Sequence, residues 1–377
     1  MGKKRTSSAS RDQQGFRASD VIDDASNGGP VRAGRDEDDA DDNIGSILLD
    51  VVKDADVNRL RAMNGSGASP AECLLTVMNW MHKWQQEYQV VMVSLTHYMD
   101  ALHSNLEDNE ALEDNTEEIK EMEDEAVVVV RGFEKIALAL LRLDDGRAAV
   151  NITDEMGWTL LMQAANCGSV GFVQSLVDEF GADVAARQHA DALGMHALAR
   201  AIDAGHMDVL GRLCTPETIN ASFSYKSQDV VVDEADAAED VEFHTPLSLA
   251  CRGGHEDMVD YFLAHAAIDV NRPLPESGDT ALHIAMCFDM DAIVHKLLRH
   301  APTIVNARNA QGYTAAFGCS NADLVGVLLS HGLDAHVEGF QGETLLDMAL
   351  ALGDEDVAAV VQAHVEQDDQ GSSNQNQ

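Results

Sequence analysis

Apolar residues recur at a fixed distance through the second half of the chain. Val173, Leu210, Val259 and Val294 each lie fourteen residues after a Thr or His that follows a turn-like dipeptide, and a second apolar residue lies three positions further on. Spacings of three and four bring apolar side chains to one face of a helix. The pattern therefore predicts a short helix with one buried face, repeated along the chain.

The same register marks the start of six repeats. They begin at Gly157-Trp158-Thr159, Gly194-Met195-His196, Phe243-His244-Thr245, Gly278-Asp279-Thr280, Gly312-Tyr313-Thr314 and Gly342-Glu343-Thr344. The glycine suits a tight turn with positive φ, and the Thr hydroxyl can cap the start of the short helix that follows it. In repeat 5 the apolar position comes three residues early, which indicates that its first helix or turn is shortened. Stacked helix pairs of this kind form a solenoid.

Several of these segments carry a recognisable sequence signature. The clearest are Thr245-Pro246-Leu247-Ser248-Leu249-Ala250, Gly254-His255, Asp269-Val270-Asn271 and Thr280-Ala281-Leu282-His283-Ile284-Ala285. On these residues the chain resembles the ankyrin-repeat family over about six repeats, residues 150–365. The resemblance implies an all-α solenoid of helix-turn-helix repeats, in an ankyrin-repeat domain of residues 147–365 that binds another protein. It does not identify the partner, because one fold serves many partners.

The sequence departs from this pattern in four places. His196 replaces the usual Thr in repeat 2, Phe243 replaces the usual Gly in repeat 3, and Asp289-Met290 replaces the Gly-His pair in repeat 4. An acidic insertion near residues 224–242 separates repeats 2 and 3. These departures leave the geometry of repeats 2 and 3 the least certain.

Residues 43–146 form a second region with a helical pattern that resembles no family. Ser69-Pro70-Ala71-Glu72 is a typical helix start, with a Ser cap, Pro in the first turn and a Glu that completes a capping box. Apolar series from Leu74 to Leu106 and from Ile119 to Leu143 predict a long antiparallel helical hairpin. Its last part, residues 133–150, could also be a degenerate capping repeat, and a weaker pattern from Leu48 to Met63 is compatible with a worn helical pair. A broad apolar face around Trp84 and Tyr98 predicts either a homodimer through residues 70–143 or another protein contact.

The two ends of the chain lack any hydrophobic period. Residues 1–42 and 366–377 are rich in small and polar residues and are expected to be disordered tails. Ser8, which follows the basic cluster Lys3-Lys4-Arg5, is a candidate phosphorylation site, and Gly2 fits the bare pattern for myristoylation.

Charge narrows the choice of partner. The 377 residues hold 65 Asp and Glu against 25 Lys and Arg, a net charge of -40. Nucleic-acid phosphates would be repelled, so we expect no nucleic-acid ligand. A partner with a basic surface is favoured, although a self-repelling surface alone would also explain the charge. The longest apolar run, Ala126 to Leu141, is interrupted by charges, so no transmembrane segment is expected.

Catalytic and metal-binding motifs are missing from the sequence. We find no phosphate loop, dinucleotide-binding glycine pattern, nucleophile elbow or zinc-binding helix motif. The six cysteines are at least 32 residues apart, too far for paired metal ligands, and suggest buried thiols of a cytoplasmic or nuclear, not secreted, protein. We therefore expect no enzyme activity, no cofactor and no metal.

The resemblance to ankyrin repeats also implies where a partner would bind, beside the turn glycines and at the end of each first helix. These positions are Glu155, Met156, Trp158, Asn166, Leu193, Met195, Asp203, Glu242, His244, Arg252, Glu276, Asp279, Phe288, Gln311, Tyr313, Phe340, Gln341 and Glu343. Trp158 and Tyr313 are either interface anchors or aromatic residues packed on the next repeat. Asn271 has the spacing of an asparagine hydroxylation site in this family.

The leading hypothesis is a non-enzymatic adaptor that binds a partner protein through the concave face and loops of the solenoid. An alternative is a regulatory subunit or effector, in which residues 43–146 change the activity of a partner enzyme while the repeats dock it.

Overall fold

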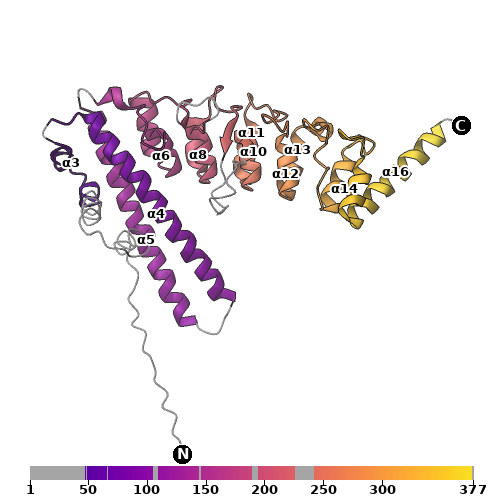
Figure 1. The fold of residues 1–377 in the computed structure, drawn as a ribbon, viewed down its shortest axis with the longest axis horizontal. Helices are drawn as coiled ribbons and strands as arrows, with labels where there is room; N and C mark the ends of the chain where they lie inside the picture. Colours follow the sequence, from indigo (N-terminus) through magenta and orange to yellow (C-terminus); the bar gives the residue numbers. More distant parts are fainter. Residues whose placement is uncertain are drawn as a thin grey trace, which may run out of the picture. The chain divides into compact units, whose positions relative to one another are not determined.

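The computed structural model describes residues 47, 49–65, 67–104, 109–143, 146–188, 194–225 and 242–375. The chain divides into two compact units, unit 1 (Met1–Asp154) and unit 2 (Glu155–Gln377), and each is described by itself (Figure 1). The first unit thus ends later than the expected boundary at residue 146. The expected tail 1–42 with Ser8, the candidate contact Leu193 and residues 226–241 of the acidic insertion lie outside the described residues.

Unit 1 is built around a helical hairpin. Its elements are α3 (Val57–Met63), α4 (Pro70–Ser104), α5 (Asn109–Leu141) and the 3-10 turn η2 (Arg147–Ala149). The long helices α4 and α5 lie side by side in opposite directions (Figure 1). The expected capping box is present, since Glu72 N–H donates to Ser69 Oγ over 3.2 Å and Ser69 N–H donates to Glu72 Oε2 over 2.7 Å.

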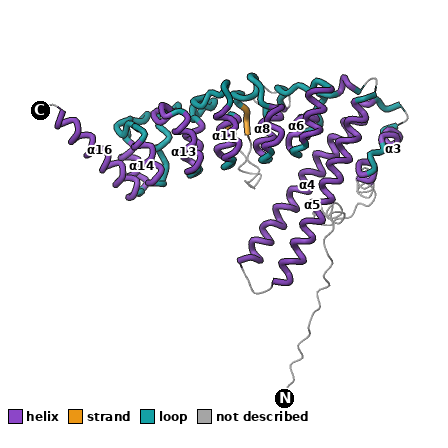
Figure 2. Tube along the Cα trace, turned by 180° about the vertical axis from the view of Figure 1, so that it is seen from behind, coloured by secondary structure: helices purple, strands orange, loops and turns teal. Residues whose placement is uncertain are grey.

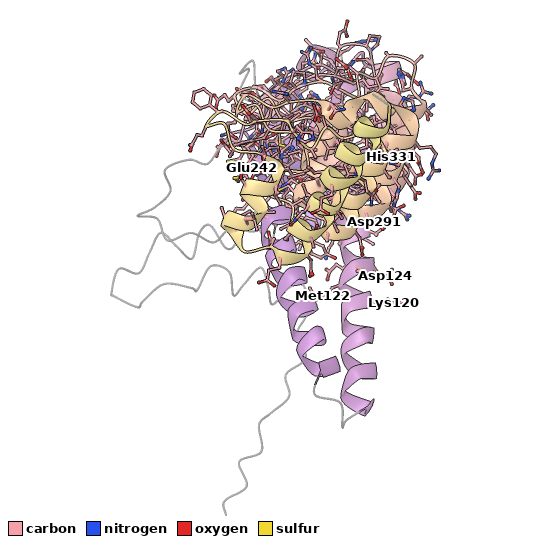
Figure 3. All side chains as sticks on the ribbon, turned by 90° about the vertical axis from the view of Figure 1, so that its right-hand side faces the viewer. Lys120, Met122, Asp124, Glu242, Asp291 and His331 are labelled. Carbon is pink, nitrogen blue, oxygen red and sulfur yellow. The ribbon has the colours of Figure 1, made fainter. Side chains whose placement is uncertain are left out.

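The core of unit 1 lies near the open end of this hairpin. Phe133, Ile136 and Leu140 of α5 are fully buried with Met78 and Met81 of α4. On α5, Met122 is buried whereas Lys120 and Asp124 are exposed (Figure 3). Trp84 is also buried and stacks on Tyr88 with ring centroids 5.2 Å apart, so it does not supply the exposed face that the sequence predicted. The dimer hypothesis stays a prediction.

Residues before α3 pack closely on α5. Residues 49–53 are helical, as the weaker sequence pattern suggested, and Val51 and Val52 are fully buried. A Cβ atom at Gly132 of α5 would lie only 2.0 Å from the Val52 carbonyl oxygen. Glycine at this position therefore permits the close approach of two backbones.

Unit 2 contains the six repeats. The first helices are α6 (Leu160–Asn166), α8 (Ala197–Asp203), α10 (Pro246–Arg252), α12 (Ala281–Cys287) and α15 (Leu345–Leu352). The second helices are α7 (Val170–Gln174) with the π-helical turn η3 (Ser175–Glu179), η5 (Met207–Val209) with α9 (Leu210–Leu213), α11 (Glu256–Ala264), α13 (Asp291–His300) followed by η6 (Pro302–Asn306), α14 (Ala322–Ser330) and α16 (Glu355–Gln375). α6, α8, α10 and α12 pack on one another in order, and the loops lie along one edge of the row (Figure 2).

Caps hold the short first helices. Ser248 N–H donates to Thr245 Oγ1 over 3.2 Å, and Thr159, Thr280 and Thr344 form corresponding capping boxes. His196, which departs from the pattern, keeps this role because its Nδ1 accepts from Ala199 N–H over 3.1 Å. The usual cap is therefore replaced without loss of the helix start.

Turn geometry explains two further positions. Gly278 has φ 70°, and a Cβ there would lie 2.6 Å from the backbone nitrogen of Ala310 in the next repeat. Asp289, which stands where other repeats have glycine, keeps a left-handed conformation with φ 53°. Aspartate tolerates this conformation better than most residues, so the turn survives the substitution.

Repeat 5 has less helix than the other repeats, and the end of unit 2 has more helix than the sequence predicted. In repeat 5 the first helix is reduced to a turn at residues 315–318, which confirms the predicted shortening. At the other extreme, α16 continues through residues 366–375, where a disordered tail was expected. Glu366, Gln367 and Gln370 are good helix formers and extend a helix already started at Glu355. None of the described helices is both long and apolar enough to cross a membrane.

Candidate functional site

A short β-hairpin joins repeats 2 and 3 and brings Tyr225 and Glu242 together. Strand β1 (Phe223–Tyr225) pairs antiparallel with β2 (Glu242–His244), and Tyr225 lies opposite Glu242. The alternation along each strand buries Phe223, Tyr225 and His244 while Glu242 is exposed. The two ends of the acidic insertion are therefore fixed beside the first helix of repeat 3.

Arg252, at the end of α10, is the centre of this site. Its guanidinium carbon lies 4.9 Å from the ring centroid of Tyr225 and 5.3 Å from that of Phe288, which follows α12. Its Nε is 3.4 Å from Glu242 Oε2. These distances fit cation–π contacts and an ion pair, which together hold the arginine side chain in place. We call the set Asp203, Tyr225, Glu242, His244, Arg252 and Phe288 the Arg252 cluster.

Burial and neighbouring charges shape the protonation of the cluster. Burial first, and then the nearby Asp203 carboxylate, raise the pKa of Tyr225 to about 12, so its hydroxyl stays protonated. Burial lowers the pKa of His244, whose Nδ1 is 3.2 Å from Ser248 Oγ. Its other ring nitrogen, Nε2, is 3.4 Å from Glu242 Oε2. At neutral pH the cluster therefore combines neutral rings with the charges of Arg252, Glu242 and Asp203.

The outer part of the cluster is both aromatic and acidic. Phe288 is 40% exposed, although large aromatic side chains are usually more buried, and Glu242 is exposed beside it. Burial, and then the charges of Asp279, Asp289 and Glu242, raise the pKa of the neighbouring Cys287 thiol. These three carboxylates therefore lie near the exposed end of α12. Such a surface can accept a cation and an apolar stem together.

Two cysteines lie at or beside the cluster. The Cys287 and Cys251 thiols both have raised pKa values, so neither is an activated nucleophile at neutral pH. Within the described residues, no three His, Cys, Asp or Glu side chains gather in a way that could hold a metal ion.

The structure separates the candidate contact residues into exposed and buried groups. Glu155, Met156, Glu242, Glu276, Phe288, Gln311, Phe340 and Gln341 are exposed, and Asn166, Asp203, Arg252, Asp279, Tyr313 and Glu343 are partly exposed. Trp158, Met195 and His244 are buried, so the expectation that these three offer contact surface was wrong. For the other described positions, a binding role stays a prediction.

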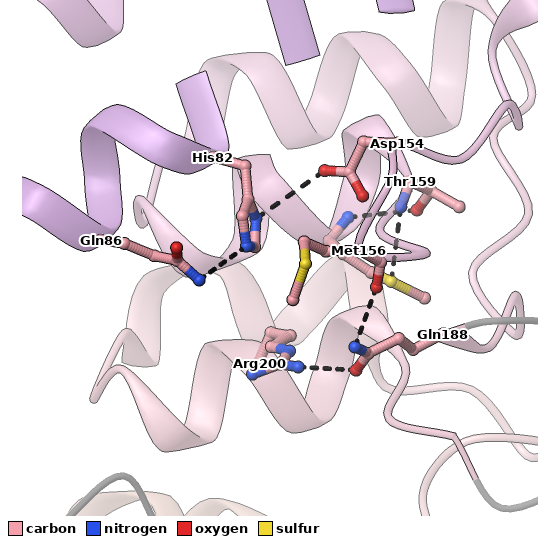
Figure 4. Close-up of polar contacts among 8 residues, drawn as sticks. His82, Gln86, Asp154, Met156, Thr159, Gln188 and Arg200 are labelled. Atoms are coloured by element: carbon pink, nitrogen blue, oxygen red, sulfur yellow. Dashed lines mark hydrogen bonds and ion pairs between the residues drawn. The ribbon is translucent and has the colours of Figure 1, made fainter. Parts of the chain in front are cut away.

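Trp158 is packed against repeat 2. The guanidinium carbon of Arg200 lies 4.0 Å from the Trp158 ring centroid, and Arg200 also donates to Gln188 Oε1 over 2.7 Å. Gln188 in turn donates to the Met156 carbonyl oxygen over 3.0 Å (Figure 4). The tryptophan therefore joins two repeats.

Tyr313 has a similar structural role at the junction of repeats 5 and 6. Its hydroxyl donates to Glu343, and its ring stacks on Phe317 with centroids 4.8 Å apart. A Cβ on Gly339 would lie 2.1 Å from the Tyr313 ring. Of the two interpretations of these aromatics, packing on the next repeat is the one that the structure shows.

Tyr225 is not among the residues predicted from the sequence. A signal was available, because Phe223-Ser224-Tyr225 alternates apolar and polar residues just before the acidic insertion, as a strand with one buried face does. Asn271, the candidate hydroxylation site, is exposed after α11, and its modification stays a prediction.

Comparisons with known proteins agree with this architecture. Residues 126–229 and 225–309 match the family model for ankyrin repeats, in three copies. No curated protein matches the chain.

Among solved structures, the chain is similar to one of the Bd0816 predatory endopeptidase from Bdellovibrio bacteriovorus in complex with the immunity protein Bd3460. That match has 20% identity, 56% of this chain and 99% of that chain covered, and a TM-score of 0.42. It is also similar to the human ASB11 ankyrin repeat domain (17% identity, 61% and 91% covered, TM-score 0.45) and to the ankyrin repeat domain of Bcl-3, a member of the IkappaB family (20% identity, 63% and 96% covered, TM-score 0.48).

The family match coincides with the stacked helix pairs and turn glycines of unit 2 and reaches into α5. Residues 126–309 of the chain therefore contain ankyrin repeats.

Proposed function

We propose that the protein is a non-enzymatic adaptor that binds a partner protein at the Arg252 cluster. The observation that carries this proposal is the exposed ring of Phe288, held beside Arg252 and next to Cys287, whose thiol is affected by the charges of nearby carboxylates. Ankyrin solenoids bind other proteins through extended surfaces of this kind. An aromatic residue in the centre of such a surface is a typical interface anchor.

The charges indicate the chemistry of the partner. Glu242 is exposed, Asp279 and Asp289 lie near the end of α12, and the chain as a whole has a net charge of -40. A Lys or Arg side chain of the partner could place its stem on Phe288 and its charge beside these acids. Arg252 is already paired with Glu242, so it positions the aromatic rings more than it recruits an anion. A basic partner surface therefore fits best.

Site-specific photo-crosslinking tests this proposal in cells. A photoreactive amino acid is placed at position 288 of the full chain, and in a matched control at position 295. His295 is also exposed but lies on α13, a second helix. We expect one covalent adduct with a partner polypeptide from position 288 and a much weaker one from position 295. Equal adducts from both positions, or none from position 288, would sink the proposal.

The same experiment tests the alternative function. If the adduct contains an enzyme, its activity is measured with the full chain and with the Phe288→Ala variant. A regulatory subunit changes the activity only when docking is intact, whereas an adaptor leaves the turnover of the bound enzyme unchanged.

A further inference from the structure

The last repeat carries an apolar surface that the other repeats bury. The residue six positions after the capping Thr or His is Ala165, Ile202, Cys251 or Met286 in repeats 1 to 4, and these are 0% or 1% exposed. The residue at that position in repeat 6, Leu350, is 63% exposed. In repeats 1 to 3 the first helix packs against the first helix of the following repeat. Leu350 thus stands where a further helix would pack.

The composition of α15 supports this. Seven of its eight residues are apolar, and only Asp347 is polar. Leu345 and Ala349 face the interior, while Leu350 is exposed on the other side of the helix. Leu352 is also exposed and is the last residue of α15. A helix that is apolar all round is normally buried on all sides. Figure 3 looks onto this end of unit 2, where α15 and α16 lie nearest the viewer.

Charge indicates what would cover this surface. After Arg308 the sequence contains eleven Asp and Glu but no Lys or Arg. Glu343 and Asp347 lie at the start of α15, and Asp354, Glu355 and Asp356 follow its end. The apolar surface is thus bordered by acids at both ends. A second copy would bring two such acidic borders together, which like-charge repulsion opposes.

We propose that α15 is a docking surface for an amphipathic helix of a partner protein, with an apolar face and basic residues at both ends. Leu350 contacts the apolar face, and the acids at the two ends of α15 pair with the flanking bases. The docked helix takes the position that the next first helix occupies between neighbouring repeats. α15 is about 12 Å long, so two to three turns of partner helix cover it. This surface is separate from the Arg252 cluster and does not depend on the function proposed for it.

Two synthetic peptides serve as probes for the full-length protein. Both have the same Leu and Ala face, one with Lys at the flanking positions and the other with Glu. Binding is measured by fluorescence anisotropy with wild type, Leu350→Ser and the control Val170→Ser. Val170 is a comparably exposed apolar residue on α7, so its substitution tests general surface effects.

We expect the Lys peptide to bind wild type and Val170→Ser alike, with affinity at least about tenfold weaker for Leu350→Ser. The Glu peptide should not bind. A Lys peptide that binds Leu350→Ser as well as wild type reports only attraction to an acidic protein, and that result would overturn the proposal. Equal binding of the Lys and Glu peptides would do the same.

Light scattering tests whether a second copy of the chain covers α15 instead of a partner helix. Self-association of wild type that is lost in Leu350→Ser would mean that a second copy covers α15, and would also contradict the proposal. A wild type that stays monomeric while it binds the Lys peptide supports it.

Discussion

The two units stabilise their helices by different means. In unit 1, α4 and α5 contain 35 and 33 residues, long enough to form many internal hydrogen bonds, and their described parts bury Met78, Met81 and Phe133. In unit 2 the first helices contain only seven or eight residues. An isolated helix of that length is not stable in water. The short first helices of unit 2 therefore depend on their caps and on neighbouring repeats, whereas α4 and α5 depend on the side chains buried between them.

The largest expected effect tests the core of unit 1. Phe133→Ala removes a fully buried aromatic ring from α5. We expect a loss of about 3–5 kcal/mol in the free energy of unfolding of unit 1, because the cavity is only partly refilled. Chemical denaturation measures it, with Val128→Ala, an exposed neighbour on α5, as the control. Equal effects of the two substitutions would mean that the paired core does not hold unit 1 together.

A pH effect comes next and belongs to unit 2. Burial first, and then the charge of Arg187, lower the pKa of His196 to about 3, far below the ordinary value of 6.5. As the pH falls below about 6.5, the unfolded chain binds a proton at His196 that the folded chain does not. Stability from the neutral ring is therefore complete above that pH and is lost towards pH 3, by roughly 1.4 kcal/mol per unit, or about 2 kcal/mol between pH 7 and pH 5.

The variant His196→Thr isolates this contribution, because Thr occupies the capping position in other repeats. We expect thermal unfolding of His196→Thr to be less sensitive to pH between 7 and 5 than that of wild type. His336→Thr, at an exposed position, is the control. If both variants keep the wild-type pH dependence, His196 does not have a lowered pKa in the folded protein, and the proposed effect of its burial is wrong.

A smaller effect compares caps directly. Thr245→Ala removes the side chain that accepts from Ser248 N–H at the start of α10, a buried cap on a seven-residue helix. We expect a loss of about 1–2 kcal/mol. Ser69→Ala removes a matching but exposed cap from α4 and should cost no more than about 0.5 kcal/mol. Similar losses in both variants would argue that helix length does not matter here.

The smallest expected effect is a gain. Asp289→Gly relieves the positive φ at the turn between α12 and α13, and should raise stability by about 0.5 kcal/mol, because part of the relief is offset by the flexibility of glycine in the unfolded chain. The reverse change at the corresponding turn, Gly254→Asp, should destabilise repeat 3, since Gly254 has φ 69°. Differential scanning calorimetry measures both. If both substitutions change stability in the same direction, the positive φ of the turn is not the cause.

The sequence predicts the repeats well because their information is local. A capping Thr, a turn glycine and the following apolar register lie within about twenty residues of one another, so one helix pair can be recognised without its neighbours. The loss of the first helix in repeat 5 was visible in the same register. The weak pattern at 48–63 likewise indicated helices that the structure contains.

Other features depend on residues from different repeats. Trp158 is covered by Arg200, and Tyr313 by Gly339 and Glu343, contacts that no local pattern in their own repeat could indicate. The Arg252 cluster combines residues from strands β1 and β2, from the end of α10 and from the residue after α12 in the next repeat. Its tyrosine lies in a β-hairpin, which a search for helical patterns does not detect. The length of α16 was missed because polar composition was taken as a sign of disorder, although Gln and Glu also favour helices.

The turn that replaces the first helix of repeat 5 has a consequence for how the solenoid unfolds. In a linear array each repeat is stabilised by its own helices and by the interface with its neighbours, and cooperativity passes from one repeat to the next through those interfaces. At residues 315–318 the row of first helices is interrupted. Fraying should therefore stop at this boundary, with repeats 5 and 6 opening as one foldon while repeats 1 to 4 remain closed, and amide hydrogens after residue 315 should exchange first.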